Sequence, residues 1–409
     1  MTAAIHYDAI VVGLGAVGAA TLYQLARRGA RVLGIDRFAP PHDRGSSHGE
    51  SRITRLAIGE GAAYVPLVQR SHTIWRALEA QTGDSILTQT GGLILSPGDG
   101  VAEHHGKPDF LRRTIANAQR FGIAHEVLDA QAIRQRFPQF HLQGNERGYY
   151  EPEAGFVRPE KAIAAQLELA RAAGAEIRTH ETVLALEGGT AAQPVQVRST
   201  HASFTAQQVV VAAGPWLPAF LGQATRDAWQ GEFAVYRQVM YWFDAGAAAD
   251  DFAPGRMPIF IWMYGDGEED YMYGFPSSDP ARPSLKVASE QYLRTTSPDA
   301  LVREVDAAEV QAMYRSRVAG RFPAIGARLL DARACMYTVT RDRDFWIDHL
   351  PDAPRVWVAS ACSGHGFKHS AGLGEALAQQ LLGEPSFVDL GAFARRSPSP
   401  SNTPRPPRR

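Results

Sequence analysis

The sequence predicts an α/β (α+β) fold with two domains, one assembled from separated segments of the chain and one built around an antiparallel sheet. Three observations support this prediction. A chain of 409 residues is too long for one simple hydrophobic core. Strand-like and helix-like segments alternate towards both ends of the chain. Between them, residues 230–295 form an aromatic, short-turned stretch that is typical of antiparallel strands.

The composition argues against several classes of protein. The chain is 45% hydrophobic and 21% charged, with a formal net charge of −1, as in ordinary globular proteins. We expect no nucleic-acid or membrane partner, because both require concentrated positive charge. Two cysteines cannot make a disulfide framework, so a cytoplasmic location is the simpler expectation. The apolar run at 10–26 is short for a bilayer span of roughly 20 residues, and Asp8 precedes it rather than a basic cluster.

The amino-terminal segment has the order of a dinucleotide-binding unit. A buried-strand pattern at 9–12 precedes Gly13, Gly15 and Gly18 in G-x-G-x-x-G spacing. These glycines permit a tight turn, close approach of a pyrophosphate and close helix packing, and the helix start attracts phosphates. After the helix and a second strand comes Asp36, which can bind a ribose. The motif predicts a Rossmann-like domain without distinguishing NAD from FAD, and a glycine-rich turn that binds nothing is the alternative.

The remaining pattern indicates how the domains are assembled. Helical periodicity occurs at 65–82, 110–121, 161–173 and near 299–315. Strand patterns at 91–97, 175–188, 195–200 and 207–216 alternate with them, and the last contains Gly214, which suits close approach of a cofactor. A strand, a glycine-rich turn and a helix near the carboxyl end return to the first domain.

We therefore divide the chain as follows: 1–90, 150–220 and 320–393 form the nucleotide-binding domain, 91–149 and 221–319 the second domain, and 394–409 a disordered Pro/Ser/Arg-rich tail. A nucleotide domain made of separated segments fits a two-domain flavoprotein better than a simple dehydrogenase with one contiguous nucleotide-binding half.

Two polar clusters are candidates for chemistry. His48, Arg52 and Arg55 are close enough to converge if their segment is helical, and they would stabilise a reduced flavin or clamp a carboxylate. A solvated helix face is the alternative. The stretch "CSGHGFKHS" at 362–370 places glycines and Lys368 at the entrance to a helix, where backbone N–H groups can face a ligand. A plain turn with a surface lysine is the alternative there.

Four stretches occur in an informative order: "SSHGESRITR", "YGFP" with a following "LK", "ACMYT" and "SGHGFKHS". With them, the chain resembles the monomeric sarcosine oxidase and N-methyltryptophan oxidase family of D-amino-acid-oxidase-like FAD enzymes, from Tyr7 to about Phe393. The resemblance implies an FAD-dependent amine oxidase that acts on a secondary or N-methylated α-amino acid. It would yield an imine, which hydrolyses to an amine and an aldehyde, and hydrogen peroxide. A monomer is implied as well.

The resemblance also implies roles around the cofactor. Cys335 matches the cysteine that joins the flavin ring as a thioether, whereas Cys362 is expected to be inert. Arg52 and His48 match residues packed against the flavin, and Lys286 matches the lysine that promotes reaction with oxygen. Further cofactor-binding residues are expected at Arg37, Ser46, Ser47, Val183, Gly214, Gly364, Gly366 and Lys368.

The implied substrate site contains Arg55 and Lys368, which would hold the substrate carboxylate, and Tyr273 and Tyr337, which would line the cavity. Glu290 stands where sarcosine-oxidising relatives carry a histidine, so it would either pair with a substrate cation or point into solvent. A cyclic imino-acid oxidase, a primary amino-acid oxidase or dehydrogenase, and a non-catalytic flavin-binding protein remain alternatives. No metal site is expected, because the histidines lack ligand spacing.

Overall fold

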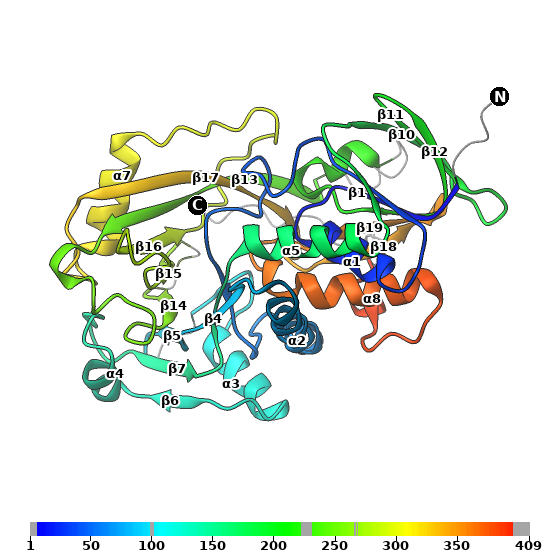
Figure 1. The fold of residues 1–409 in the computed structure, drawn as a ribbon. Coiled ribbons are helices and arrows are strands. Elements are labelled where there is room, and N and C mark those ends of the chain that lie inside the picture. Colours follow the sequence, from blue (N-terminus) through cyan, green and yellow to red (C-terminus); the bar gives the residue numbers. More distant parts are fainter. Residues whose placement is uncertain (1–5, 99–101, 222–230, 266, 268, 396–409) are drawn as a thin grey trace.

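The structure is a computed structural model that describes residues 6–98, 102–221, 231–265, 267 and 269–395 (Figure 1). Most of the predicted tail at 394–409, from residue 396 onward, lies outside the described residues. Two large sheets lie towards opposite ends of the molecule, with a layer of helices beside the first of them (Figure 1).

The first sheet has eight strands and a parallel centre. Strand β1 pairs in parallel with β2 and β12, and β12 pairs in parallel with β19. Residues 9–12 of β1 are all buried, as a strand covered on both faces requires. The strands of this sheet are β1 (His6–Val12), β2 (Val32–Ile35), β9 (Glu176–Arg178), β10 (Val183–Gly188), β11 (Val195–Ser199), β12 (Ser203–Val211), β18 (Trp346–Leu350) and β19 (Ala353–Ser360).

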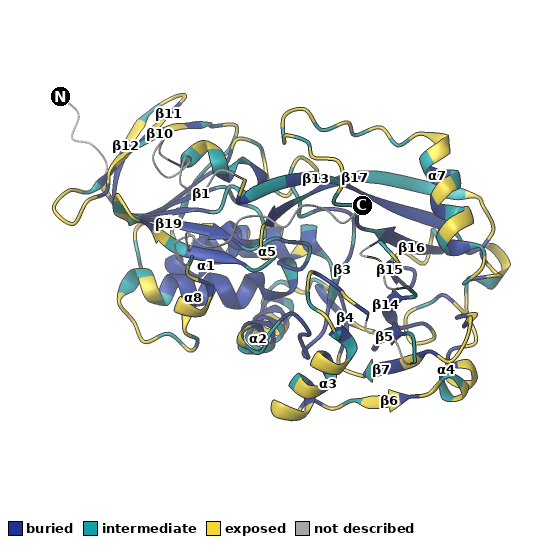
Figure 2. Ribbon diagram, turned by 180° about the vertical axis from the view of Figure 1, so that it is seen from behind, coloured by how far each residue is buried: buried dark blue, intermediate teal, exposed yellow. Residues whose placement is uncertain are grey.

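Buried helices cover this sheet (Figure 2). The central one, α1 (Ala16–Ala26), contacts α5 (Pro159–Ala172) and α8 (Ser370–Leu382), and α8 also contacts α2 (Val65–Thr82). Helices α1 and α8 approach closely because Gly374 faces Ala20. A Cβ at Gly374 would lie 2.5 Å from the Ala20 Cβ, so a larger residue would separate the two helices.

The second sheet has eight strands and is antiparallel except for the parallel pair β14–β5, which confirms the predicted sheet in outline. Its apolar core includes Phe260, Trp262 and Phe322. In sheet order the strands are β17 (Leu329–Thr340), β13 (Phe233–Asp244), β16 (Ser284–Ser289), β15 (Tyr271–Phe275), β14 (Ile259–Met263), β5 (Gly92–Ser96), β7 (Arg147–Glu151) and β6 (Glu126–Leu128).

Three sequence predictions need correction. Strand β17 lies within 320–393, which we assigned to the first domain, but it pairs with β13 in the second sheet. Of the helix expected near 299–315, only α7 (Ala307–Met313) forms, followed by a π-helical turn, Tyr314–Val318. The segment with Arg52 and Arg55 is not helical: a loop leads into strand β3 (Arg52–Thr54), which pairs with β8 (Gly155–Val157).

Strand β4 (Leu87–Gln89) completes a small third sheet on the other side of β8. The remaining elements are α3 (Phe110–Arg120), α4 (Ala130–Arg136) and 3₁₀ turns at Ala62–Tyr64, Gly214–Phe220, Gly246–Ala248, Phe367–His369 and Leu390–Phe393. Among the described residues, no helix combines the length and the apolar character needed to cross a membrane.

Candidate active site

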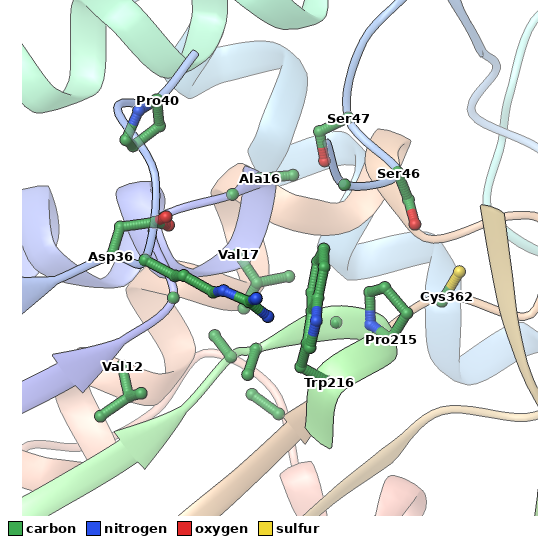
Figure 3. A pocket seen from close by; sticks show the side chains of 18 of the residues that line it. Val12, Ala16, Val17, Asp36, Pro40, Ser46, Ser47, Pro215, Trp216 and Cys362 are labelled. Atoms are coloured by element: carbon green, nitrogen blue, oxygen red, sulfur yellow. The ribbon is translucent and has the colours of Figure 1, made fainter. Parts of the chain in front are cut away.

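A cavity of about 360 Å³ opens where β1 and β2 end and α1 begins (Figure 3). The side chain of Trp216 stands in it, and Asp36, Ser46 and Ser47 border it (Figure 3). The predicted cofactor-binding residues that line this cavity are Gly13, Gly15, Asp36, Arg37, Ser46, Ser47, Val183, Gly214, Gly364 and Gly366.

The glycine turn has the geometry that the motif predicts. Gly13 has a φ of 85°, which an L-residue rarely adopts. Gly18 does not line the cavity but packs beneath it, because a Cβ there would lie 1.8 Å from the Gly13 carbonyl oxygen. A Cβ on Gly15 would meet only the Ser47 hydroxyl, at 3.8 Å, and Gly15 lines the cavity. Helix α1 therefore begins at the cavity, where its unpaired N–H groups suit a phosphate group.

Polar groups along the cavity fit a dinucleotide. Asp36 accepts hydrogen bonds from the Leu14 and Phe38 amides, both 2.7 Å, which fixes its carboxylate at the wall. The Ser46 hydroxyl is buried without a partner among the described residues, so it is available to a ligand. At the rim, Asp299 accepts from Arg37 and Trp216 at 2.8 and 3.2 Å.

Cys335 lies beside this cavity rather than on its wall. The thiol is in strand β17, and its residue is 2% exposed. Its Sγ is 3.6 Å from the Ser46 carbonyl oxygen and 3.7 Å from Arg52 Nη2. Cys362 does line the cavity, and burial raises the pKa of its thiol. A thioether at Cys335 would therefore have its sulfur next to the Arg52 guanidinium and the Ser46 carbonyl.

A second cavity, of about 60 Å³, adjoins the first. Arg52, Tyr337, Gly364 and Phe367 line both cavities, so a ligand in one lies next to a ligand in the other. The predicted catalytic and substrate-binding residues on the wall of the second cavity are Lys286, Arg52, Arg55, Lys368, Tyr273, Tyr337 and Glu290. The hydroxyls of Tyr273 and Tyr337 are 3.0 Å apart.

His48, expected beside the flavin, lines neither cavity. It is 3% exposed, and neither ring nitrogen has a partner among the described residues. Burial, reinforced by the nearby charge of Arg52, lowers the pKa of His48 to about 3, so the ring is neutral at pH 7. Lys368, expected at both sites, lines only the second cavity.

Lys286 is a buried lysine between the loop and the second sheet. Its Nζ donates to the Gly49 carbonyl at 2.5 Å and to the Ser51 carbonyl and hydroxyl at 2.9 Å. It also lies over the Phe275 ring, 4.5 Å from the centroid. Burial and then Arg52 lower the pKa of Lys286 well below its usual range.

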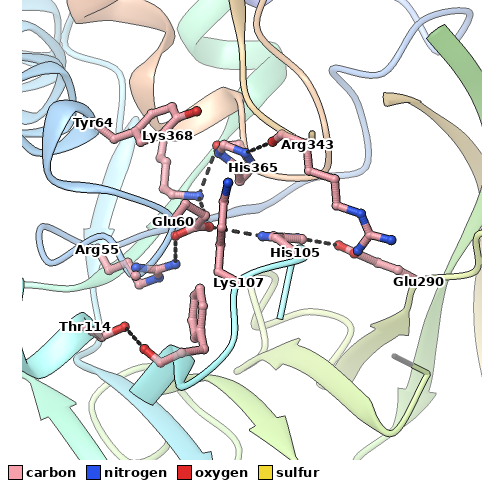
Figure 4. A network of polar contacts seen from close by, with 12 residues as sticks. Arg55, Glu60, Tyr64, His105, Lys107, Thr114, Glu290, Arg343, His365 and Lys368 are labelled. Atoms are coloured by element: carbon pink, nitrogen blue, oxygen red, sulfur yellow. Dashed lines mark hydrogen bonds and ion pairs between the residues drawn. The ribbon is translucent and has the colours of Figure 1, made fainter. Parts of the chain in front are cut away.

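The two cations expected to hold a carboxylate already share a protein carboxylate, that of Glu60 (Figure 4). Arg55 Nη2 is 2.8 Å from Glu60 Oε2, and Lys368 Nζ is 3.7 Å from Oε1. Burial would raise the pKa of Glu60, but Arg55 and Lys368 outweigh it, and the pKa falls well below its usual range. Burial lowers the pKa of Lys368 to about 8 although Glu60 opposes it.

Glu290 is 4% exposed, so the alternative in which it points into solvent is wrong. Its Oε1 lies 3.3 Å from Nε2 of His105, and its Oε2 accepts from the Tyr292 hydroxyl. Burial would raise the pKa of Glu290, but His105 outweighs it and the pKa is lowered. The carboxylate is therefore already paired with protein groups, His105 and Tyr292.

Sequence reasoning missed Glu60 and His105, which join the two ends of this polar network (Figure 4). The only signals were an acid five positions after Arg55 and adjacent histidines in a polar loop. No group of three or more His, Cys, Asp and Glu side chains suited to a metal ion occurs within the described ranges.

The glycine turn, the cavity beside it and the adjoining cavity lined by basic side chains form the arrangement expected of a dinucleotide-dependent oxidoreductase. The sequence profile of the family described as "FAD dependent oxidoreductase" matches residues 8–380. The chain therefore belongs to the FAD dependent oxidoreductase family, and its cofactor is FAD.

Individual relatives agree with this assignment. The chain is 38% identical to a monomeric sarcosine oxidase of Streptomyces avermitilis, over 95% of this chain and 97% of the relative. It is 34% identical to an N-methyl-L-tryptophan oxidase of Yersinia pestis, over 95% and 98%. Among solved structures, NikD, an amino acid oxidase essential for nikkomycin biosynthesis, has the same fold. The two structures compare with a TM-score of 0.79 at 22% sequence identity, and the comparison covers 98% of this chain and 100% of NikD.

Proposed function

We propose that this protein is an FAD-dependent oxidase of a secondary or N-methylated α-amino acid. The observation that supports it most is the second cavity, where Arg55 and Lys368 lie beside the wall shared with the FAD cavity. The relatives named as sarcosine and N-methyl-L-tryptophan oxidases act on such amines. The substrate carboxylate would bind Arg55 and Lys368, which places the carbon next to nitrogen towards the shared wall.

FAD, when bound, accepts the two electrons and the hydrogen that leave the carbon next to nitrogen. The chain orients the substrate through Arg55 and Lys368 and encloses it with Tyr273 and Tyr337. Among the described residues, the two carboxylates on the cavity wall, Glu60 and Glu290, are already paired with Arg55 and His105. We infer that the substrate reacts as the neutral amine, so the rate at saturating substrate rises with pH until the amine is fully deprotonated.

A cyclic secondary amino acid is the second candidate substrate. The cavity volume of about 60 Å³ favours a compact molecule over one with a large aromatic side chain. Hydrogen peroxide release should be compared for sarcosine, N-methyl-L-tryptophan, L-proline and glycine under air. If sarcosine has the highest kcat/KM of the four, the main proposal is supported. If L-proline has the highest kcat/KM, the second candidate is supported. Turnover of none of the four, with FAD bound, would contradict both.

We also propose that Cys335 carries the FAD as a thioether. The thiol lies within 3.7 Å of Arg52, which lines both cavities. Acid precipitation of the purified protein should leave the yellow colour in the pellet, and Cys335→Ala should release it to the supernatant. Cys362→Ala is the matched control, because that thiol lines the same cavity and should leave the linkage intact. Colour in the supernatant of the unmodified protein would exclude a covalent bond.

Oxygen is the proposed electron acceptor, and Lys286 is the proposed group that promotes its reduction. A cation stabilises the negative charge that develops as oxygen accepts electrons. We further propose a cytoplasmic monomer, in keeping with the name of the Streptomyces relative. Sedimentation velocity at micromolar concentration would test the monomer.

A further inference from the structure

His105 is an imidazole held between two buried carboxylates (Figure 4). Its Nδ1 is 3.1 Å from Glu60 Oε1, and its Nε2 is 3.3 Å from Glu290 Oε1. The three side chains are at most 5% exposed. An ionised carboxylate only accepts hydrogen bonds, whereas a neutral imidazole has a single N–H. With both carboxylates ionised, this geometry requires a proton on each ring nitrogen.

The backbone supports a defined position for this ring. His105 has a φ of 52°, in the left-handed region that residues other than glycine rarely adopt. Such conformations persist where the surroundings determine them. Gly364 provides the space, since a Cβ there would lie 2.9 Å from His105 Nε2 and 3.0 Å from Glu290 Oε1. The ring thus forms part of the wall of the substrate cavity.

Ion pairs around this ring link five titratable or charged groups. Glu60 and Glu290 contribute two negative charges, while Arg55, Lys368 and His105 contribute three positive ones. Without the His105 proton, the same five groups would carry no net charge. The other described titratable or charged groups near the ring or on the same cavity wall are His104, His365, Tyr271, Tyr273, Tyr292, Tyr337, Arg343, Arg52 and Lys286.

We propose that His105, protonated on both nitrogens, is a positioning residue for the substrate carboxylate: it holds Glu60 and Glu290 in place and offsets their charge, so that the wall accepts one further anion. This inference rests on the proposed oxidation of an amino acid. Burial would lower the pKa of His105, but the two carboxylates outweigh it and raise the pKa.

The test uses two inert probes and the FAD-loaded protein. Methoxyacetate replaces the N–H of sarcosine by oxygen and has no amine to oxidise, and methoxyacetamide is its uncharged counterpart. Calorimetric titration at pH 7, where Lys368 stays protonated, should show His105→Gln weakening methoxyacetate by at least about tenfold, because a positive charge is removed within a few ångströms of the anion. Methoxyacetamide should change by less than about twofold. His125→Gln, a histidine outside both cavities, is the control.

Charge rescue distinguishes this role from a packing role. Adding Glu290→Gln to His105→Gln removes one negative charge and should restore methoxyacetate binding to within about threefold. Glu290→Gln alone removes a negative charge from the same wall and should strengthen methoxyacetate binding, which keeps the test available if His105→Gln fails to fold. Equal weakening of both probes, unchanged methoxyacetate binding, or failure of the double variant to recover would overturn the proposal. Anaerobic bleaching of the flavin by sarcosine reports on the proposed function separately.

Discussion

The two adjoining cavities are built in different ways. The FAD cavity is bordered in part by one continuous motif, with Gly13 and Gly15 at the turn and Asp36 at the next strand end. The substrate cavity is bordered by charged side chains from distant segments, and its network joins residues 45 and 185 positions apart. Cofactor binding therefore depends on local chain geometry, whereas substrate binding depends on how distant charges are balanced.

If that contrast holds, replacing Lys286 should reduce turnover without releasing FAD. We expect Lys286→Met to slow the reaction of the reduced flavin with oxygen by about 100-fold or more, because one preorganised cation at a site of developing charge is worth that much. Stopped-flow mixing of the reduced protein with oxygen measures the rate. Flavin content is the control. An unchanged oxidation rate would remove Lys286 from the chemistry.

A smaller effect is expected from Arg55→Leu, which removes a carboxylate-binding cation and leaves Glu60 with one fewer partner. Truncating one member of a buried charge pair costs about 2 kcal/mol or more, so kcat/KM should fall by about 30-fold or more with FAD still bound. Arg113→Leu is the matched control, because Arg113 contacts only the Gly59 and Glu60 carbonyls and lines neither cavity. Equal losses in both variants would indicate a structural role for Arg55.

The pH dependence of KM should expose Lys368. Its pKa is about 8 in the folded protein, against 10.5 for an ordinary lysine. We expect KM to rise about tenfold between pH 8 and 10 as the ammonium is lost, while the rate at saturating substrate increases with amine deprotonation. The stability of the fold depends on pH in the opposite direction. Between pH 8 and 10.5 Lys368 is protonated in the unfolded chain but not in the folded one, so its contribution to the free energy of unfolding rises with pH. In Lys368→Gln the KM rise should disappear; its persistence would assign it to another group.

The mildest change tests the wall shared by the two cavities. Gly364→Ala places a methyl group 3.0 Å or less from His105 and Glu290 and strains a φ of 82°. Gly383→Ala strains a φ of 69° at the end of α8, where a Cβ meets nothing within 4 Å. Both should lose about 1 kcal/mol of unfolding free energy from backbone strain, and only Gly364→Ala should also raise KM. Thermal melts and steady-state kinetics separate the two effects. A raised KM in Gly383→Ala would contradict the local argument.

The sequence predicted most where the signal is local. Helix α2 has the predicted bounds, Val65–Thr82, and the first glycine turn forms as its spacing requires. The helix predicted for Arg52 was wrong, because long-range pairing decides the structure there. Arg52 lies on strand β3, which pairs with β8, about 100 positions later.

The polar network around Glu60 could not be predicted for the same reason. His105 reaches it from a loop before α3 that has no periodicity, and Glu290 reaches it from the end of β16. The position of Glu290 could be read from the resemblance, but its partner could not. Only the folded chain shows that the Glu290 carboxylate is already paired with His105 and Tyr292.

Anaerobic mixing of the purified, FAD-loaded protein with sarcosine tests the central claim most directly. Loss of the flavin absorbance, followed by one equivalent of hydrogen peroxide when oxygen is admitted, is the predicted result. If no secondary, cyclic or primary amino acid bleaches the flavin, the second cavity is not an amine-oxidation site, and the account of its charges would be contradicted.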